Sequence, residues 1–196
     1  MVARWTTHRF RKSSNGNIDQ LTQYNKGDRP RAQEPGWSPD GKKIAYVVGS
    51  RFIYIIDADG GNPKMFLDGR TFIREPLWSP DGKRILYSEW TFANGDVVSS
   101  RAVVVNLQGV EKQEKFLPPG WAMSSKSWMG NTKALLAIHN PPSKTDIFLW
   151  DLATDAALQN LTNAPSIDWT PDWIDDAVLE ASSLKKKVTL WGRLKE

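Results

Sequence analysis

The chain has 196 residues and no cysteine. Its length suits one domain or one compact repeat array, and the lack of cysteine excludes disulfide bonds and thiolate metal sites. The formal net charge of +4 is uneven: residues 1–31 carry a net +5, residues 184–196 a net +4 and residues 32–183 a net −5. No apolar run approaches the roughly 18 residues that a membrane span needs, and the first residues lack the apolar stretch of a secretory signal.

Residues 1–31 form a basic segment without a repeat unit of its own. Its stretch 18–22, Ile-Asp-Gln-Leu-Thr, resembles Leu-Gln-Asn-Leu-Thr at 158–162, which ends a unit farther along the chain. An unpaired strand edge promotes aggregation, and the last unit runs out before a fourth strand. We therefore expect residues 18–22 to supply that outer strand and to join the two ends of the chain.

A repeat begins after this segment and is nearly verbatim in its first two copies. Residues 34–49 read EPGWSPDGKKIAYVVG, and residues 75–90 read EPLWSPDGKRILYSEW. Trp37 and Trp78 are 41 residues apart. That period is typical of one propeller blade of four short strands.

The first copy shows how a unit is built. Pro39 fixes φ at the second position of the turn, Asp40 tolerates the third, and Gly41 accepts a positive φ. Segments rich in β-branched and aromatic residues follow. They predict strands at 43–48, 52–56 and 64–67.

Two fainter copies follow the second turn, which contains Pro80, Asp81 and Gly82. Trp128 lies 50 residues after Trp78, and Trp173 lies 45 residues after Trp128. The third unit replaces Ser-Pro-Asp-Gly by Met-Gly-Asn-Thr, and the fourth keeps only Thr-Pro-Asp-Trp. We expect the units at about 32–69, 70–120, 121–163 and 164–196, within a single domain of residues 1–196.

The Trp-Ser-Pro-Asp-Gly turn, the apolar strand and the later Asp-Ala-Asp-Gly-Gly-Asn turn resemble the PD40, or WD40-like, repeat of the TolB-like propeller family. The first two units match closely, and the last two depart from the pattern. The resemblance implies four-stranded blades stacked around a channel. It also implies a protein-binding or scaffolding role, commonly periplasmic or otherwise extracytoplasmic, although the chain itself leaves its compartment unknown.

These observations predict an all-β fold, a β-propeller of four-stranded antiparallel blades. Four units predict four blades, which is at the low end for propellers. The alternatives are an incomplete larger propeller, as a truncated product, or an open arc that dimerises. A large indole beside each turn suits packing between neighbouring blades, so we assign a structural role to the repeat residues: Trp37, Pro39, Asp40, Gly41, Trp78, Pro80, Asp81, Gly82, Trp128 and Trp173.

No pattern of residues points to catalysis, a metal or a cofactor. The two histidines, His8 and His139, lie in different parts of the chain. A nucleophile elbow and a phosphate-binding glycine loop are absent. The segment Asp57–Asn62 does not follow the spacing of a calcium loop, so we interpret it as a turn between strands.

Two sets of residues are candidates for binding a partner. Glu34 and Glu75 each lie three residues before a repeat Trp, where they can line one rim of the channel. If the ends pair, basic residues of both termini share a face that suits an acidic protein, a nucleic acid or an anionic surface, although a merely solvated face is the simpler interpretation. The basic candidates are Arg9, Arg11, Lys185, Lys186 and Lys187.

The sequence favours a non-enzymatic propeller that mediates protein–protein contact, because complete structural repeats occur without a catalytic set. The alternatives are a hydrolase or lyase with its active site at the channel mouth and a propeller fragment of a larger peptidase-like protein. Convergence of Glu34, Glu75, His139 and an arginine would favour the enzyme.

Overall fold

The computed structural model describes residues 3–6, 9–14, 17–22, 31–69, 71–140, 144–154, 156–162 and 171. All regular secondary structure in these residues is β-strand, arranged in antiparallel sheets. The all-β fold of four-stranded antiparallel sheets predicted from the repeats is confirmed. Over the same residues, no helix has the length and apolar character to cross a membrane.

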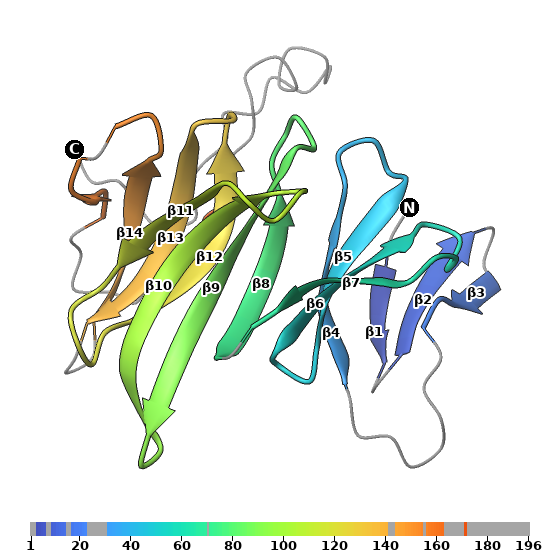
Figure 1. The fold of residues 1–196 in the computed structure, drawn as a ribbon, viewed down its shortest axis with the longest axis horizontal. Helices are drawn as coiled ribbons and strands as arrows, with labels where there is room; N and C mark the ends of the chain where they lie inside the picture. Colours follow the sequence, from blue (N-terminus) through green and yellow to red (C-terminus); the bar gives the residue numbers. More distant parts are fainter. Residues whose placement is uncertain are drawn as a thin grey trace.

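Three four-stranded sheets stand in a row and form blades 1, 2 and 3 (Figure 1). Each is a meander in which neighbours along the chain pair with one another. Blade 1 contains β4 (Ala32–Trp37), β5 (Lys43–Val48), β6 (Phe52–Asp57) and β7 (Lys64–Asp68). Blade 2 contains β8 (Phe72–Trp78), β9 (Arg84–Ala93), β10 (Asp96–Asn106) and β11 (Lys112–Phe116). Blade 3 contains β12 (Ala122–Met129), β13 (Lys133–Asn140), β14 (Lys144–Asp151) and β15 (Gln159–Asn160).

The basic N-terminal segment forms a further, three-stranded sheet of β1 (Ala3–Thr6), β2 (Arg9–Ser14) and β3 (Asn17–Gln20). The strand expected near residues 18–22 is β3, and its paired neighbour is β2. The unit expected at 164–196 falls almost entirely outside the described residues, and Trp173 with it. The pairing of residues 18–22 with that unit, and the count of four blades, therefore stay predictions.

The apolar core lies between the blades because each sheet must cover both of its faces. Residues Ile44–Val48 of β5 are all buried, since the strand has a neighbour on either face. One cluster joins blades 1 and 2 through Val47, Ile53, Ile73 and Tyr87. A second cluster joins blades 2 and 3. Burial on both faces explains why these strands are continuous apolar runs rather than alternating ones.

A serine completes each Ser-Pro-Asp-Gly turn. The Ser38 hydroxyl donates to the Asp40 carboxylate at 2.6 Å and accepts from the Lys43 N–H at 2.8 Å. Ser79 makes the same two contacts in blade 2, at 2.6 and 2.9 Å. Gly41 and Gly82 both have a φ of 69°, which a Cβ would disfavour. The turn is therefore closed by side chains as well as by backbone.

The repeat tryptophans reach across to the preceding blade. The Trp78 indole N–H donates to the Gly36 carbonyl at 3.1 Å, and the Trp128 N–H donates to the Leu77 carbonyl at 3.2 Å. Both side chains are buried. A Cβ built on Gly36 would lie 2.5 Å from the Pro76 carbonyl oxygen, so only glycine permits this approach of the two inner strands.

Replacing Ser38 or Ser79 by Ala should lower the free energy of unfolding by about 1–2 kcal/mol, because each buried serine hydroxyl bonds a backbone N–H and an Asp carboxylate at once. Ser99→Ala, at an exposed strand position, serves as the matched control and should have almost no effect. Urea unfolding curves measure all three. Equal stabilities for all variants would contradict a role of the hydroxyl in the turn.

Candidate functional site

The innermost strands of blades 1 and 2 are each distorted at a glutamate. Glu34 has a φ of 55° and Glu75 a φ of 54°, in the left-handed region that residues other than glycine seldom adopt. Both lie where the ladder to the next strand shifts register, between Gln33 and Gly36 in β4 and between Arg74 and Leu77 in β8. Such bulges redirect a side chain. Here they direct the carboxylates toward the following blade.

Each redirected carboxylate binds the inner strand of the next blade. Glu34 forms an ion pair with Arg74 and accepts a hydrogen bond from the Glu75 N–H at 2.7 Å. One blade farther on, the Glu75 carboxylate accepts from the Lys126 ammonium at 2.8 Å. These four residues, Glu34, Arg74, Glu75 and Lys126, are called the inner-strand ladder. It carries two acids and two bases, so its formal net charge is zero.

The members of the inner-strand ladder differ in exposure: the side chains of Arg74 and Glu75 are 36% and 24% exposed. The Glu34 side chain is 14% exposed and that of Lys126 is 15% exposed. Burial raises the pKa of Glu34, and this effect outweighs the opposing hydrogen bond from the Glu75 N–H and the nearby Arg74 charge. The second carboxylate oxygen of Glu75 is buried without a hydrogen-bond partner. The ionised ladder is therefore held at a cost in desolvation.

The ladder ends at blade 3, where Ser125 replaces the glutamate. The Ser125 hydroxyl lies 2.8 Å from that of Ser88, and the Ser125 N–H donates to the same Ser88 oxygen at 2.8 Å. At the other end, Gln33 occupies the position that Arg74 has in blade 2, and it contacts Ser50 within its own blade. Among the described residues, the charged contact thus occurs at the two boundaries between blades 1, 2 and 3.

The structure describes the surroundings of some candidate binding residues but not of others. Glu34 and Glu75 are brought together, but by contacts between blades rather than as open carboxylates on a rim. Arg9 and Arg11 lie in β2, where only the backbone is described. Lys185, Lys186 and Lys187 lie outside the described residues. Partner binding at either set stays a prediction.

The described residues do not assemble the catalytic set that would favour an enzyme. The hydrogen bonds found for Glu34 and Glu75 there lead to neighbouring inner strands, whereas His139 Nδ1 lies 3.2 Å from the Thr145 hydroxyl of its own blade. The Asp57–Asn62 segment closes as a turn, with the Asn62 amide donating to Asp57 at 2.8 Å. Across all the described residues, no group of three or more His, Asp or Glu side chains is placed to hold a metal ion.

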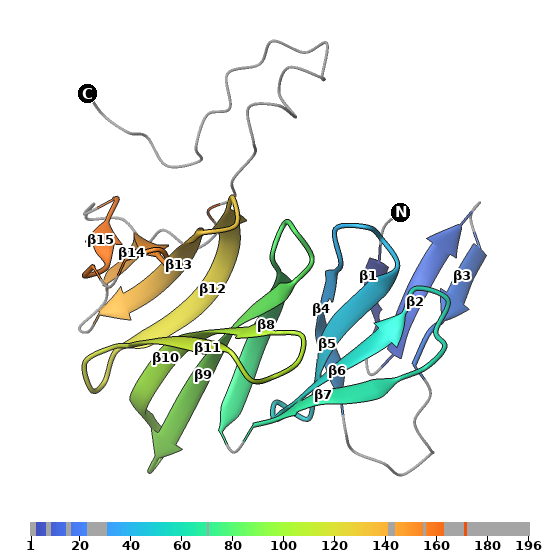
Figure 2. The same cartoon turned by 45° about the horizontal axis from the view of Figure 1, so that its top comes forward.

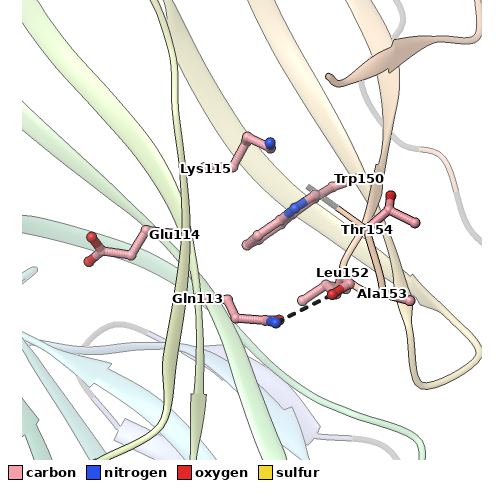
Figure 3. Close-up of a pocket in the computed structure, with 7 residues that line it drawn as sticks. All are labelled: Gln113, Glu114, Lys115, Trp150, Leu152, Ala153 and Thr154. Atoms are coloured by element: carbon pink, nitrogen blue, oxygen red, sulfur yellow. Dashed lines mark hydrogen bonds between the residues drawn. The ribbon is translucent and has the colours of Figure 1, made fainter. Parts of the chain in front are cut away.

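An open groove of about 400 Å³ runs along the outer seam of blades 2 and 3 (Figure 3). The Gln113 amide donates to the Leu152 carbonyl at 3.3 Å, and the Lys115 ammonium donates to the Ala156 carbonyl at 3.0 Å. The Trp150 indole is almost wholly buried beneath. Because these hydrogen bonds join the two blades, we interpret the groove as part of the contact between blades 2 and 3 and not as a binding site. Its lining residues are Gln113, Glu114, Lys115, Trp150, Leu152, Ala153 and Thr154.

A feature that the repeat argument missed is a long hairpin in blade 2. Strands β9 and β10 have ten and eleven residues, against six in each of β5 and β6, and their hairpin extends past the rest of the blade (Figures 1 and 2). Residues 91–99 are called the arm. It turns at Asn94 and Gly95, with φ values of 53° and 91°, which suits the tight turn that Asn-Gly favours. That dipeptide was the signal available in the sequence.

Aromatic side chains gather at the base of the arm. The ring centroids of Phe72 and Phe92 are 5.5 Å apart, and those of Trp90 and Phe92 are 6.0 Å apart. The Arg74 guanidinium lies within 6 Å of the Phe72 and Trp90 rings. The same arginine is held by Glu34, so the inner-strand ladder and the aromatic cluster form one connected site.

The titration of Glu34 should make the free energy of unfolding depend on pH, and this dependence should be absent in the variant Glu34→Gln. A raised pKa in the folded state stabilises the fold fully below the unfolded value of about 4.5, and this contribution is lost as the pH rises through the folded value. Wild type should therefore gain stability relative to Glu34→Gln as the pH falls from 7 to 4.5, measured by urea unfolding.

Asp40→Asn is the control, because the Ser38 hydrogen bond lowers the pKa of Asp40. Its difference from wild type should stay flat above pH 4.5, and wild type should lose its advantage only as the pH falls below about 3.8. A wild type that weakens relative to Glu34→Gln on acidification would contradict the dominance of burial at Glu34.

Removing only one member of the Glu75–Lys126 pair should be worse than removing both charges. Lys126→Met should cost about 1–3 kcal/mol, since it leaves a shielded carboxylate without its cation. The double variant Lys126→Met, Glu75→Gln should recover part of that loss in chemical denaturation. Lys133→Met, from a more exposed pair at 3.9 Å, is the control and should change stability little. Strictly additive single and double variants would contradict coupling across the blades.

No protein-family model matches the chain, and no curated protein matches its sequence. Solved structures do resemble it. TolB from Acinetobacter baumannii aligns with a TM-score of 0.63 and 20% identity, covering 82% of this chain and 38% of that one. A puromycin-hydrolyzing peptidase of Mycobacterium tuberculosis gives 0.64 and 18%, covering 80% and 26%. An oligogalacturonate lyase from Vibrio parahaemolyticus gives 0.60 and 10%, covering 77% and 45%.

At these identities the resemblance establishes the fold and leaves the activity open. The chain spans less than half the length of each of these three proteins. Its blades nevertheless superpose on TolB over most of their residues, as the repeats led us to expect. This chain has the TolB-like β-propeller fold.

Proposed function

We propose that this chain is a non-enzymatic propeller that binds another protein through the aromatic arm of blade 2. The observation that carries the proposal is exposed apolar surface on a projecting hairpin. Phe92 is 44% exposed and Val98 is 40% exposed, and they lie on the two paired strands of the hairpin, β9 and β10. Single exposed apolar residues are common on protein surfaces. A cluster around an aromatic base is characteristic of contact sites.

The charged residues support the same proposal. The carboxylates that seemed suited to a channel-mouth site, Glu34 and Glu75, are neutralised by Arg74 and Lys126. A partly shielded, neutral network rigidifies the inner strands. It thereby supplies a firm base for the arm, and a preformed surface loses less entropy on binding.

The hydrolase or lyase alternative ranks second. A peptidase and a lyase are among the proteins of similar fold. The enzyme would be favoured by His139 lying beside the two glutamates and an arginine, but the hydrogen bond described for His139 leads to Thr145 of its own blade. The fragment alternative concerns only the size of the whole protein. The arm could bind a partner both in this chain alone and in a larger protein that contains it. An anionic partner at the basic termini remains a separate hypothesis.

Photo-crosslinking in the host cells tests the proposal. A photoreactive amino acid replaces Phe92 in one variant and Phe116 in a matched control, which is 60% exposed on the outer strand of the same blade. We expect protein adducts at position 92 with a yield several times that at position 116. Absence of adducts at position 92, together with turnover of peptide or oligosaccharide substrates that His139→Ala abolishes, would overturn the proposal in favour of the enzyme.

A further inference from the structure

The arm extends beyond the paired parts of both edge strands of blade 2, β8 and β11. The ladder between β8 and β9 reaches only the pair Phe72 and Trp90, and the ladder between β10 and β11 reaches only Arg101 and Phe116. Beyond these points, the strand pairing described for residues 91–99 joins only β9 to β10. A ribbon open on both sides can accept a further strand.

The two open edges differ in regularity. The β10 edge contains a register shift between Val97 and Ser99, where Val98 bulges out of the ladder. Bulges are one of the ways in which proteins protect an edge from pairing. The extra residue of this bulge is on β10, opposite the step from Thr91 to Phe92, so β9 itself runs through Thr91–Ala93 without an inserted residue. Within the strand pairing of the described residues, it is therefore the edge available to a regular added strand.

The β9 edge also lacks the charges that protect the outer strands of the blades. Outer strand β11 carries Lys112, Glu114 and Lys115, and β7 begins with Lys64 and ends with Asp68. Such charges discourage strand addition. Residues Thr91–Ala93 are uncharged, and they lie beside the ring cluster of Phe72, Trp90 and Phe92.

We propose that an extended segment of a partner protein adds as a strand to Thr91–Ala93 and places an apolar side chain against Phe92. Residues directly opposite one another in neighbouring strands share a face of the sheet. The residue opposite Phe92 would therefore contact the aromatic cluster, while its neighbours point to the other face. The segment recognised is thus short, extended and apolar at alternate positions.

A segment fits this surface better than a second copy of the chain. The arm offers nine residues, of which three form the open edge, whereas a stable interface takes about 20–30 residues from each partner. Strand addition obtains its contacts from the backbone and one or two side chains. A transient, peptide-like interaction follows from that size.

The test uses the full chain and a synthetic seven-residue peptide of alternating Thr and Val with a central Phe. A second peptide has the same side chains but carries N-methyl groups on alternate backbone nitrogens, which removes donors to an adjoining strand. Amide chemical shifts of the ¹⁵N-labelled chain report where each peptide binds. We expect shifts at Thr91 and Ala93, and affinity about tenfold lower for the N-methylated peptide, because the ladder hydrogen bonds are lost.

Variants locate the edge. The double variant Thr91→Lys, Ala93→Lys should weaken the unmodified peptide by a similar factor, whereas Ser99→Lys on the β10 edge should leave its affinity unchanged. Thermal unfolding of each variant confirms that the blades stay folded. Equal affinity of both peptides, shifts confined to residues 96–99, or no binding of either peptide would each overturn strand addition.

The inference rests on the proposed function, and the two fail differently. Protein adducts at position 92 combined with any of the overturning peptide results would leave the protein-binding role intact and refute only the added strand. Lack of adducts at position 92, with the peptide still bound at Thr91–Ala93, would refute the cellular role while leaving the open edge in place.

Discussion

The close approach of neighbouring inner strands governs this structure. Gly36 allows the Pro76 carbonyl to come near, and the Trp78 indole then donates to the Gly36 carbonyl. At the same boundary the left-handed conformation of Glu34 directs its carboxylate to the Glu75 N–H and to Arg74. A four-stranded sheet cannot cover its own two faces. Contacts of this kind between blades, together with the apolar clusters, make the row of blades stable.

The same contacts connect stability to the candidate site. Arg74 belongs to the ladder through Glu34 and to the aromatic cluster through Phe72 and Trp90. The Trp90 indole N–H in turn donates to the Met123 carbonyl of blade 3. The base of the arm is therefore fixed to both neighbouring blades, while Phe92 and Val98 remain partly exposed to solvent. A rigid base and an open edge are the two features on which the proposed recognition of another chain rests.

The repeats made the fold class predictable, because turn residues and apolar strands recur at a blade-like period. The arm could also have been anticipated: the 50 residues between Trp78 and Trp128, against 41 between the first two, indicate extra length, and Asn94-Gly95 marks its turn. The conformation of Glu34 could not have been anticipated, since no local sequence pattern marks a glutamate that adopts a positive φ. Its partner Arg74 lies 40 residues away, and only the stacked blades bring the two together.

Native-state hydrogen exchange measures the contact between blades most directly. The N–H groups of Glu75 and Ser125 bond to side chains across the two boundaries, at 2.7 and 2.8 Å. If the blades are stable only together, both amides should exchange through the same opening as the interiors of β5, β9 and β13. If they exchange as fast as exposed loops while those strand interiors stay protected, each blade is stable by itself and the account is wrong.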